Sequence, residues 1–236
     1  MTGLKVASLD VTGTLIHCPR MGEIYSEVLA RHGIEVTPDD VRRTFPVVWQ
    51  ELDCLTPAGA DRFSTYSGGS RAWWGRLIER LCELLEAGTP TLFATKELFH
   101  RFEQADAWEI YPDAVASLDR LAGAGMRLAA LSNFDERLPR LLGALDLAQR
   151  FEAIVASADV GLAKPNPAIF EILLRRFEVA ADAAVHIGNS AREDVEGAEA
   201  AGLQALLVDR GEGREEALLD AVSGLLQRPD ARIAEV

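Results

Sequence analysis

The residues best suited to chemistry follow the first apolar stretch of the chain. Residues 4–9 read Leu-Lys-Val-Ala-Ser-Leu, which is typical of a buried strand, and residues 10–15 then read Asp-Val-Thr-Gly-Thr-Leu. Open α/β sheets bind ligands in the crevice outside the carboxyl ends of their strands, so Asp10 is well placed for chemistry. Gly13 lets the backbone come close to a ligand, and the Thr14 hydroxyl can turn back toward the carboxylate. On these residues alone, a simple Asx-turn at Asp10 remains an equal alternative.

Length, composition and net charge limit the number of domains and the classes of partner that the protein can have. The chain has 236 residues, 48% of them hydrophobic, which fits one α/β core with an insertion or two small domains. The formal net charge of −13 argues against nucleic-acid and anionic-membrane partners, because basic patches supply that attraction. An anionic substrate would need a few local cations or a bound metal.

Cysteine usage and hydropathy predict the compartment. The three cysteines (Cys18, Cys54 and Cys82) have no Cys-x-x-Cys spacing, which is typical of free thiols in a reducing compartment. The first residues lead directly into the predicted strand and leave no room for a signal peptide. No apolar run approaches the ~20 residues that span a bilayer. We therefore expect a cytoplasmic protein without a membrane or nucleic-acid partner.

An all-helical insertion is predicted after the first strand. The helix that begins at Thr37 has a Thr-Pro-Asp-Asp start, and Pro46 is expected to kink or split it. Residues 53–70, rich in Gly, Ser and Thr, are expected to form a loop over a site. The four predicted helices span residues 22–31, 37–49, 71–85 and 89–102. This pattern predicts a helical cap over residues 16–107, with the core formed by residues 1–15 and 108–236.

From residue 108 onward, short apolar strands alternate with helices of about ten residues. This alternation predicts βαβ units and hence a doubly wound parallel sheet of α/β class. The predicted strands are residues 4–9, 127–131, 153–156, 184–187 and 205–208. The predicted helices are residues 113–121, 135–145, 168–177 and 192–201, and a polar tail follows Gln227.

Four strand ends carry polar residues in a recognisable order. The order is Asp-x-Thr-Gly-Thr-Leu, then Ser-Asn, then Lys-Pro-x-Pro, then Gly-x-Ser-x-x-x-Asp-x-x-Gly-Ala-x-x-Ala-Gly. In this order the chain resembles the haloacid dehalogenase-like hydrolase superfamily, in the subclass with a helical cap inserted after the first motif. The resemblance covers nearly the whole chain. The side chains concerned are Asp10, Ser132, Asn133, Lys164, Asn189 and Asp194.

The resemblance implies a role for each catalytic residue. Asp10 would be the nucleophile that forms an aspartyl intermediate, which water then hydrolyses. Ser132, Asn133 and Thr14 would bind the transferring group. Lys164 would bind it too, neutralise developing charge and keep Asp10 ionised, since a nearby ammonium lowers a carboxyl pKa.

The same resemblance implies a Mg²⁺ site. Asp10, Asp194, Asn189 and the Thr12 carbonyl would hold the ion, which prefers oxygen ligands. The metal would let an anionic phosphate approach Asp10 in a protein of this charge.

Two positions depart from the phosphatase pattern. Thr12 stands where these phosphatases carry the Asp that serves as general acid and base. P-type ATPases resemble this chain in having Thr at this place, and their aspartyl phosphate is long-lived. Because general acid–base assistance contributes about 10²–10⁴-fold, we expect slow turnover. Asn189 replaces a second metal-binding Asp, so weak Mg²⁺ binding is expected. The metal-free 2-haloacid dehalogenases also lack acids at both positions, but carry Tyr where this chain has Thr12.

Several residues have structural alternatives. Asp135 is expected to be an N-cap rather than a replacement acid, and Ser190 with Glu193 forms a capping box, which leaves Asp194 open to either role. His186 is expected in the core. Core packing is also expected for Trp73 and Trp74, whereas Arg62, Tyr66 and Arg71 of the cap could select the substrate.

Three hypotheses follow. The first is a phosphatase of small phosphorylated metabolites that works through phospho-Asp10. The second is metal-independent dehalogenation of 2-haloacids by the same nucleophile. The third is a catalytically degenerate member of the superfamily that binds or regulates. The sequence specifies neither the substrate nor the oligomeric state.

Overall fold

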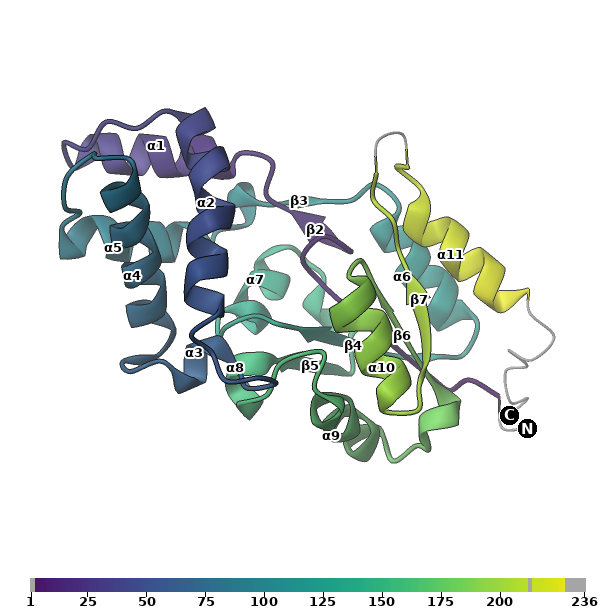
Figure 1. The fold of residues 1–236 in the computed structure, drawn as a ribbon. Coiled ribbons are helices and arrows are strands. Elements are labelled where there is room, and N and C mark those ends of the chain that lie inside the picture. The colour runs from purple at the N-terminus through teal and green to yellow at the C-terminus, as the bar shows by residue number, and fades with distance from the viewer. Residues whose placement is uncertain (1–2, 212–213, 228–236) are drawn as a thin grey trace.

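A five-stranded sheet forms the centre of the computed structural model, which describes residues 3–211 and 214–227. All its pairings are parallel, in the order β5-β4-β1-β6-β7 (Figure 1). The chain adds β4 and β5 on one side of β1 and β6 and β7 on the other, so the order reverses at β1, where α/β sheets open a binding crevice. This confirms the predicted doubly wound parallel sheet. The strands are β1 (Val6–Leu9), β4 (Arg127–Ser132), β5 (Ala153–Ala156), β6 (Ala184–Gly188) and β7 (Gln204–Leu207).

Helices cover both faces of this sheet. In β1, Ala7 and Leu9 join one hydrophobic cluster and Val6 joins another, as the alternation of a strand requires. The first cluster includes α6 (Ala114–Gly123), α7 (Leu138–Ala144) and α11 (Ala217–Leu226), and the second includes α9 (Pro167–Phe177) and α10 (Gly197–Ala200). The connecting turns are η1 (Ala105–Ala107), η2 (Ala148–Arg150), α8 (Ser157–Val160), η3 (Ala181–Ala183) and the π-helical η4 (Ala191–Glu196).

The helical region of residues 21–101 lies beside the sheet and encloses a core of its own (Figure 1). Trp73, Leu77 and Leu81 of one helix pack there against Val41 and Val48 of another. Helical spacing places these side chains on one face of each helix. The region contains α1 (Met21–Arg31), α2 (Pro38–Asp53), α3 (Arg62–Thr65), α4 (Gly69–Leu84) and α5 (Leu92–Arg101).

Three details of this region differ from the sequence prediction. Helix α2 continues unbroken through Pro46, because the proline lies on the solvent-exposed side, where water can bond the carbonyl that it frees. Helix α5 begins after Thr91, whose hydroxyl accepts the Ala94 N–H, and not at Thr89. The predicted loop of residues 53–70 contains α3, which Asp61 caps.

A two-stranded antiparallel ribbon joins the helical region to the rest of the chain. It pairs β2 (Ile16–His17) with β3 (Glu109–Ile110) and was not predicted, because two residues show no periodicity. Helix α11 was also not predicted, and most of the expected polar tail lies outside the described residues. None of the described helices is both long and apolar enough to cross a membrane.

Candidate active site

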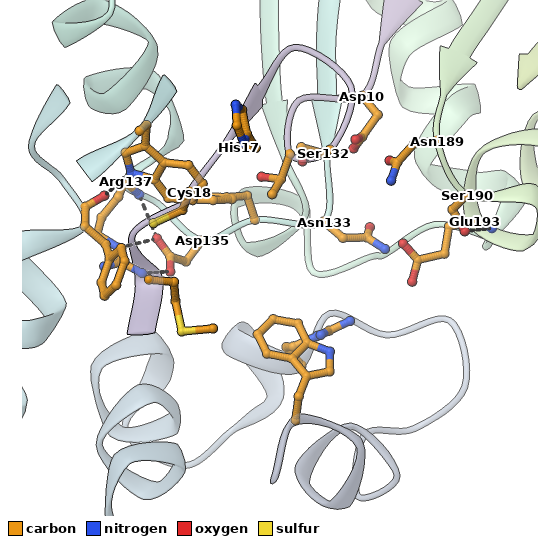
Figure 2. Close-up of a pocket in the computed structure, with 18 of the residues that line it drawn as sticks. Asp10, His17, Cys18, Ser132, Asn133, Asp135, Arg137, Asn189, Ser190 and Glu193 are labelled. Carbon is orange, nitrogen blue, oxygen red and sulfur yellow. Dashed lines mark hydrogen bonds and ion pairs between the residues drawn. The ribbon is translucent and has the colours of Figure 1, made fainter. Parts of the chain in front are cut away.

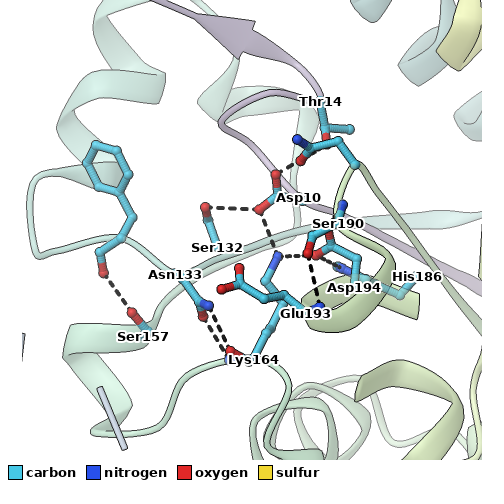
Figure 3. A network of polar contacts seen from close by, with 12 residues as sticks. Asp10, Thr14, Ser132, Asn133, Ser157, Lys164, His186, Ser190, Glu193 and Asp194 are labelled. Carbon is cyan, nitrogen blue, oxygen red and sulfur yellow. Dashed lines mark hydrogen bonds and ion pairs between the residues drawn. The ribbon is translucent and has the colours of Figure 1, made fainter. Parts of the chain in front are cut away.

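Asp10 lies directly after β1 with its carboxylate held on both sides. Its backbone N–H donates to the Ile187 carbonyl of β6 (2.9 Å), and the side chain is almost buried. Oδ1 accepts from Lys164 Nζ (2.7 Å) and from Ser132 Oγ (3.2 Å), while Oδ2 accepts from Thr14 Oγ1 (3.2 Å; Figure 3). These contacts fix the orientation of the carboxylate at the sheet edge where ligands bind.

Lys164 lies between two carboxylates and is only 3% exposed. Its ammonium donates to Asp10 Oδ1 and to Asp194 Oδ1. Burial alone would lower the pKa of Lys164, but the charges of Asp10 and Asp194 outweigh it and raise this pKa above its usual value. Lys164 is therefore a fixed positive charge beside Asp10.

Asn133 positions the backbone of Lys164. Its side-chain Oδ1 accepts the Lys164 N–H (2.8 Å), and its Nδ2 donates to the Lys164 carbonyl (2.9 Å; Figure 3). This amide is thus engaged with the lysine segment, and the implied contact of Asn133 with a transferring group stays a prediction.

Asp194 is buried beneath the loop that follows β6. Besides Lys164, its Oδ1 accepts from His186 Nε2 (3.1 Å), and its Oδ2 accepts the Ser190 N–H (2.8 Å). Burial would raise the pKa of Asp194, but the His186 hydrogen bond and the Lys164 charge lower it well below its usual range. Gly188 makes room for this carboxylate, because a Cβ there would lie 2.2 Å from Asp194 Cγ.

His186 is a buried, hydrogen-bonded core residue, as its position in an apolar strand predicted. Burial lowers the pKa of its imidazole, which favours the neutral form. A carboxylate only accepts, so Nε2 carries the proton toward Asp194 and Nδ1 accepts from the Ser8 hydroxyl (2.6 Å).

We call Asp10, Ser132, Lys164 and Asp194 the polar floor of the site. The sequence predicted that these four residues would meet, and the structure brings them together (Figure 3). The catalytic and metal-binding roles that the resemblance implies for them remain predictions.

Oxygen atoms suited to Mg²⁺ lie at the edge of the polar floor. Thr14 Oγ1 bridges Asp10 Oδ2 (3.2 Å) and Asn189 Oδ1 (3.3 Å). Gly13, with φ of +85°, passes so close to Asn189 that a Cβ would lie 2.5 Å from its Nδ2. No three His, Cys, Asp or Glu side chains among the described residues are grouped to hold a metal. These oxygens fit Mg²⁺ in kind, but both the Asp10 and the Asp194 carboxylates already accept from protein donors. Weak Mg²⁺ binding stays a prediction.

A cavity of about 570 Å³ opens beside Asp10, between the core and the helical region (Figure 2). Asp10, Thr12, Ser132 and Asn189 line its core side. Aromatic rings that line the rest of the cavity form what we call the aromatic wall. These are Tyr25, Phe45, Trp49, Phe63, Trp74, Phe102, Trp108 and Phe134. The cavity suits a small ligand with an apolar body and a polar end that faces Asp10.

Asp135 forms a buried ion pair within this cavity, which corrects its predicted role as an N-cap. Its carboxylate accepts from Arg137 Nε (2.8 Å) and Nη2 (2.6 Å) and from Trp74 Nε1 (2.7 Å; Figure 2). Arg137, not Asp135, precedes α7. Because the carboxylate is fully engaged, it does not replace the acid missing at Thr12.

The remaining predicted residues separate into core and cavity. Trp73 is core, as expected, whereas Trp74 lines the cavity, contrary to expectation. Arg62 lines it as well, but Tyr66 and Arg71 are not among its lining residues. Cys18 also lines the cavity, which the sequence did not predict. Burial raises the pKa of its thiol to about 11, which makes it a poor nucleophile at neutral pH.

Ser190 and Glu193 form the predicted start of η4. The Glu193 N–H donates to Ser190 Oγ (3.1 Å), as in half of a capping box, although the first turn is π-helical. The Glu193 side chain lines the cavity, and burial raises its pKa.

A family model described as haloacid dehalogenase-like hydrolase matches residues 4–202, so the chain belongs to this family. Haloacid dehalogenase-like hydrolase domain-containing protein 3 of Mus musculus is 31% identical over 225 residues, covering 93% of this chain and 87% of that protein. Phosphoserine phosphatase of Thermus thermophilus is 36% identical over 144 residues, or 59% and 57% of the two chains. The L-2-haloacid dehalogenase structure from Xanthobacter autotrophicus shares the fold, with a TM-score of 0.67 at 19% identity over 94% of this chain and 83% of that one. These findings confirm the resemblance seen in the motifs.

Proposed function

We propose that the protein is a phosphatase of small phosphorylated metabolites that uses Asp10 as its nucleophile. The observation that carries this proposal is the Asp10 carboxylate, which faces the cavity while Lys164, Ser132 and Thr14 hold its two oxygens. The phosphoserine phosphatase among the relatives supports a phosphate monoester as substrate.

In the proposed reaction, Asp10 attacks phosphorus, and the bond from phosphorus to the leaving oxygen breaks. The resulting phospho-Asp10 is hydrolysed by water, which releases inorganic phosphate and restores the carboxylate. Lys164 stabilises the charge on the transferring group, and Ser132 orients it by hydrogen bonding.

Mg²⁺ is the proposed cofactor, held weakly by Asp10, Asn189 and the Thr12 carbonyl with help from Asp194. When bound, it supplies positive charge that offsets the phosphate dianion beside Asp10. Weak binding is expected because Asn189 supplies no charge and because both the Asp10 and the Asp194 carboxylates already accept from protein donors.

Residues 16–107, which contain the helical region of residues 21–101, are the proposed cap over the core. Across the proposed boundary, Ser157 Oγ of the core donates to the Asp61 carboxylate of the cap (2.6 Å), which attaches the two parts to each other. Exclusion of water by such a cap protects the reacting group. We further propose a cytoplasmic location and neither nucleic-acid nor membrane partners.

The direct test is phosphate release from a broad panel of phosphate monoesters by the wild type and by Asp10→Asn. The proposal expects Mg²⁺-dependent release that falls by at least about 10³-fold in the variant. Unchanged release in Asp10→Asn would exclude Asp10 as the nucleophile.

Metal-independent dehalogenation of 2-haloacids is the second candidate. The non-acidic residues at Thr12 and Asn189 favour it, because they leave little to bind a metal. Halide release that a chelator leaves unchanged would support it. If neither phosphate nor halide is released, a degenerate binding or regulatory role remains.

A further inference from the structure

Two arginines line the cavity, and their hydrogen bonding differs sharply. Arg137 donates from Nε and Nη2 to Asp135 and from Nη1 to the Phe99 carbonyl. Arg62 is 7% exposed, yet its buried Nη1 has no hydrogen-bond partner. A buried charged donor without a partner carries a free-energy cost that folded proteins normally avoid, so it calls for a functional explanation.

The surroundings of Arg62 neutralise it only in part. Its Nη2 lies 3.1 Å from Asp53 Oδ1, but the Asp53 side chain is 46% exposed and its charge is screened by water. The central carbon of the guanidinium also lies 4.5 Å from the centroid of the Trp49 ring, so the cation contacts the aromatic wall. Nη1 therefore keeps unused donor capacity in a residue that lines the cavity.

Local contacts fix Arg62 where it can reach a ligand. Asp61, the residue before it, caps α3 by accepting from the Phe63 and Ser64 N–H groups, and it also accepts from Ser157 Oγ of the core. The Asp61 N–H donates to the Gly161 carbonyl (3.1 Å). These bonds attach α3 to the core, so Arg62 lines the same cavity as Asp10.

We propose that Arg62 binds a carboxylate at the end of the substrate remote from the phosphate. The substrate class is then a phosphate monoester whose leaving group has an apolar, ring-like body, packed on the aromatic wall, and a carboxylate beyond it. The planar guanidinium of Arg62 matches the geometry of a carboxylate. Because Asp53 already offsets part of the positive charge of Arg62, a singly charged group is enough to neutralise the rest. This inference rests on the proposed function for the phosphate end only.

Binding of non-hydrolysable phosphonates tests the inference without depending on turnover. The probes are para-(phosphonomethyl)benzoate, its biphenyl analogue with a longer spacer, and the methyl ester of each. Quenching of Trp49 and Trp74 fluorescence, with Mg²⁺ present, reports their binding. With a net charge of −13, the protein as a whole favours the less negative ester, so preference for the acid requires a local cation.

The wild type is expected to bind the acid about 10- to 100-fold more tightly than its ester with at least one spacer, because a hydrogen bond to a charged group is worth about 1.5–3 kcal/mol. Arg62→Met should reduce this ratio to about one. Arg71→Met is the matched control, because Arg71 is an exposed arginine of the same region outside the cavity lining, and its ratio should equal that of the wild type.

Asp53→Asn gives an independent readout that keeps the arginine. Removal of the competing carboxylate should raise the acid-to-ester ratio above that of the wild type, which loss of structure alone would not produce. Equal binding of acid and ester with both spacers, or an unchanged ratio in Arg62→Met, would overturn the inference.

Phosphate monoesters built on the same acid and methyl-ester pairs separate this inference from the proposed function. If the acid-to-ester preference appears in binding but no phosphate is released, the proposed function fails and the anion site stands. If phosphate is released equally from acid and ester and the phosphonates bind equally, the anion site at Arg62 fails and the proposed function stands.

Discussion

The polar floor and the aromatic wall enclose one cavity but are built in opposite ways. In the polar floor, buried charges neutralise one another, with Lys164 between Asp10 and Asp194. The aromatic wall comes mainly from the helical region and buries rings around two arginines, of which Arg137 is paired in full and Arg62 is not. On the proposed function, this difference would separate two tasks: the floor would hold the reacting groups in place, and the wall would select the substrate that reaches them.

Thr12→Asp is expected to produce the largest change at the polar floor. It supplies the missing general acid and base, so phosphate release should rise by about 10²–10⁴-fold at neutral pH. Steady-state kinetics on the best ester of the panel measure this, with Thr12→Asn as the control that adds a similar volume without an acid. A fall in rate with Asp would mean that the site is adapted to other chemistry.

Lys164→Met tests whether the charges of the polar floor depend on one another. Loss of the ammonium leaves two buried carboxylates together, so the free energy of unfolding should fall by about 3–5 kcal/mol in urea titrations. Lys96→Met, at an exposed site, should change it by no more than about 0.5 kcal/mol. Equal losses in the two variants would contradict the buried network.

The pH dependence of that difference follows from the pKa shifts. The pKa of Asp194 is lowered, so its contribution is present above its unfolded value of about 3.9 and is lost as pH falls through the lowered pKa. The pKa of Lys164 is raised, so its contribution is present below about 10.4 and is lost as pH rises through the raised pKa. The stability difference between the wild type and Lys164→Met should therefore be largest from neutral pH to about pH 9 and should shrink in acid, because the two carboxylates left without the ammonium repel each other and the variant regains stability when it binds a proton.

Asn189→Asp tests the metal site at the edge of the polar floor. An extra carboxylate beside Asp10 should lower the melting temperature in a chelator and restore it in Mg²⁺. At an ion concentration of about 100 times the dissociation constant, binding stabilises by about 2.7 kcal/mol. Asn166→Asp, which adds the same charge outside the cavity, should show no recovery with Mg²⁺.

Trp74→Phe and Trp108→Phe compare two hydrogen bonds of the aromatic wall. Trp74 Nε1 donates to the Asp135 carboxylate (2.7 Å), and Trp108 Nε1 donates to the Phe102 carbonyl (3.1 Å). Each variant loses the same ring area, but the charged acceptor makes the Trp74 bond worth about 1.5–3 kcal/mol against about 0.5–1.5 for the neutral one. Urea unfolding should show the larger loss for Trp74→Phe, and the opposite order would contradict the greater strength assigned to the hydrogen bond with the carboxylate.

The polar floor could be predicted from the sequence because each of its residues lies at the carboxyl end of an apolar strand or in the segment that follows one. Parallel strands end at one edge, so order along the chain translates directly into proximity. The sheet and the α/β class followed from the same alternation. By contrast, the bonds of Asn133 to the Lys164 backbone could not be predicted, and its expected contact with the transferring group stays a prediction.

The aromatic wall could not be predicted in the same way. Its rings come from several separate elements, such as Tyr25 in α1 and Trp108 before β3, and no spacing joins them. Asp135 resembled an N-cap by position, whereas its partners Arg137 and Trp74 were set by tertiary packing. Helix α11 has apolar Leu218, Val222 and Leu225 at helical spacing, a signal that could have predicted it.

One measurement tests most directly whether Asp10 is the nucleophile. The wild type, Asp10→Asn and Thr12→Asp are incubated with acetyl phosphate, with and without Mg²⁺, and the intact masses and phosphorylated peptides are recorded. We expect a Mg²⁺-dependent phosphoryl group on Asp10 in the wild type, none in Asp10→Asn, and a shorter lifetime in Thr12→Asp. A phosphoryl group on another residue, or phosphate release that persists in Asp10→Asn, would contradict the proposed mechanism.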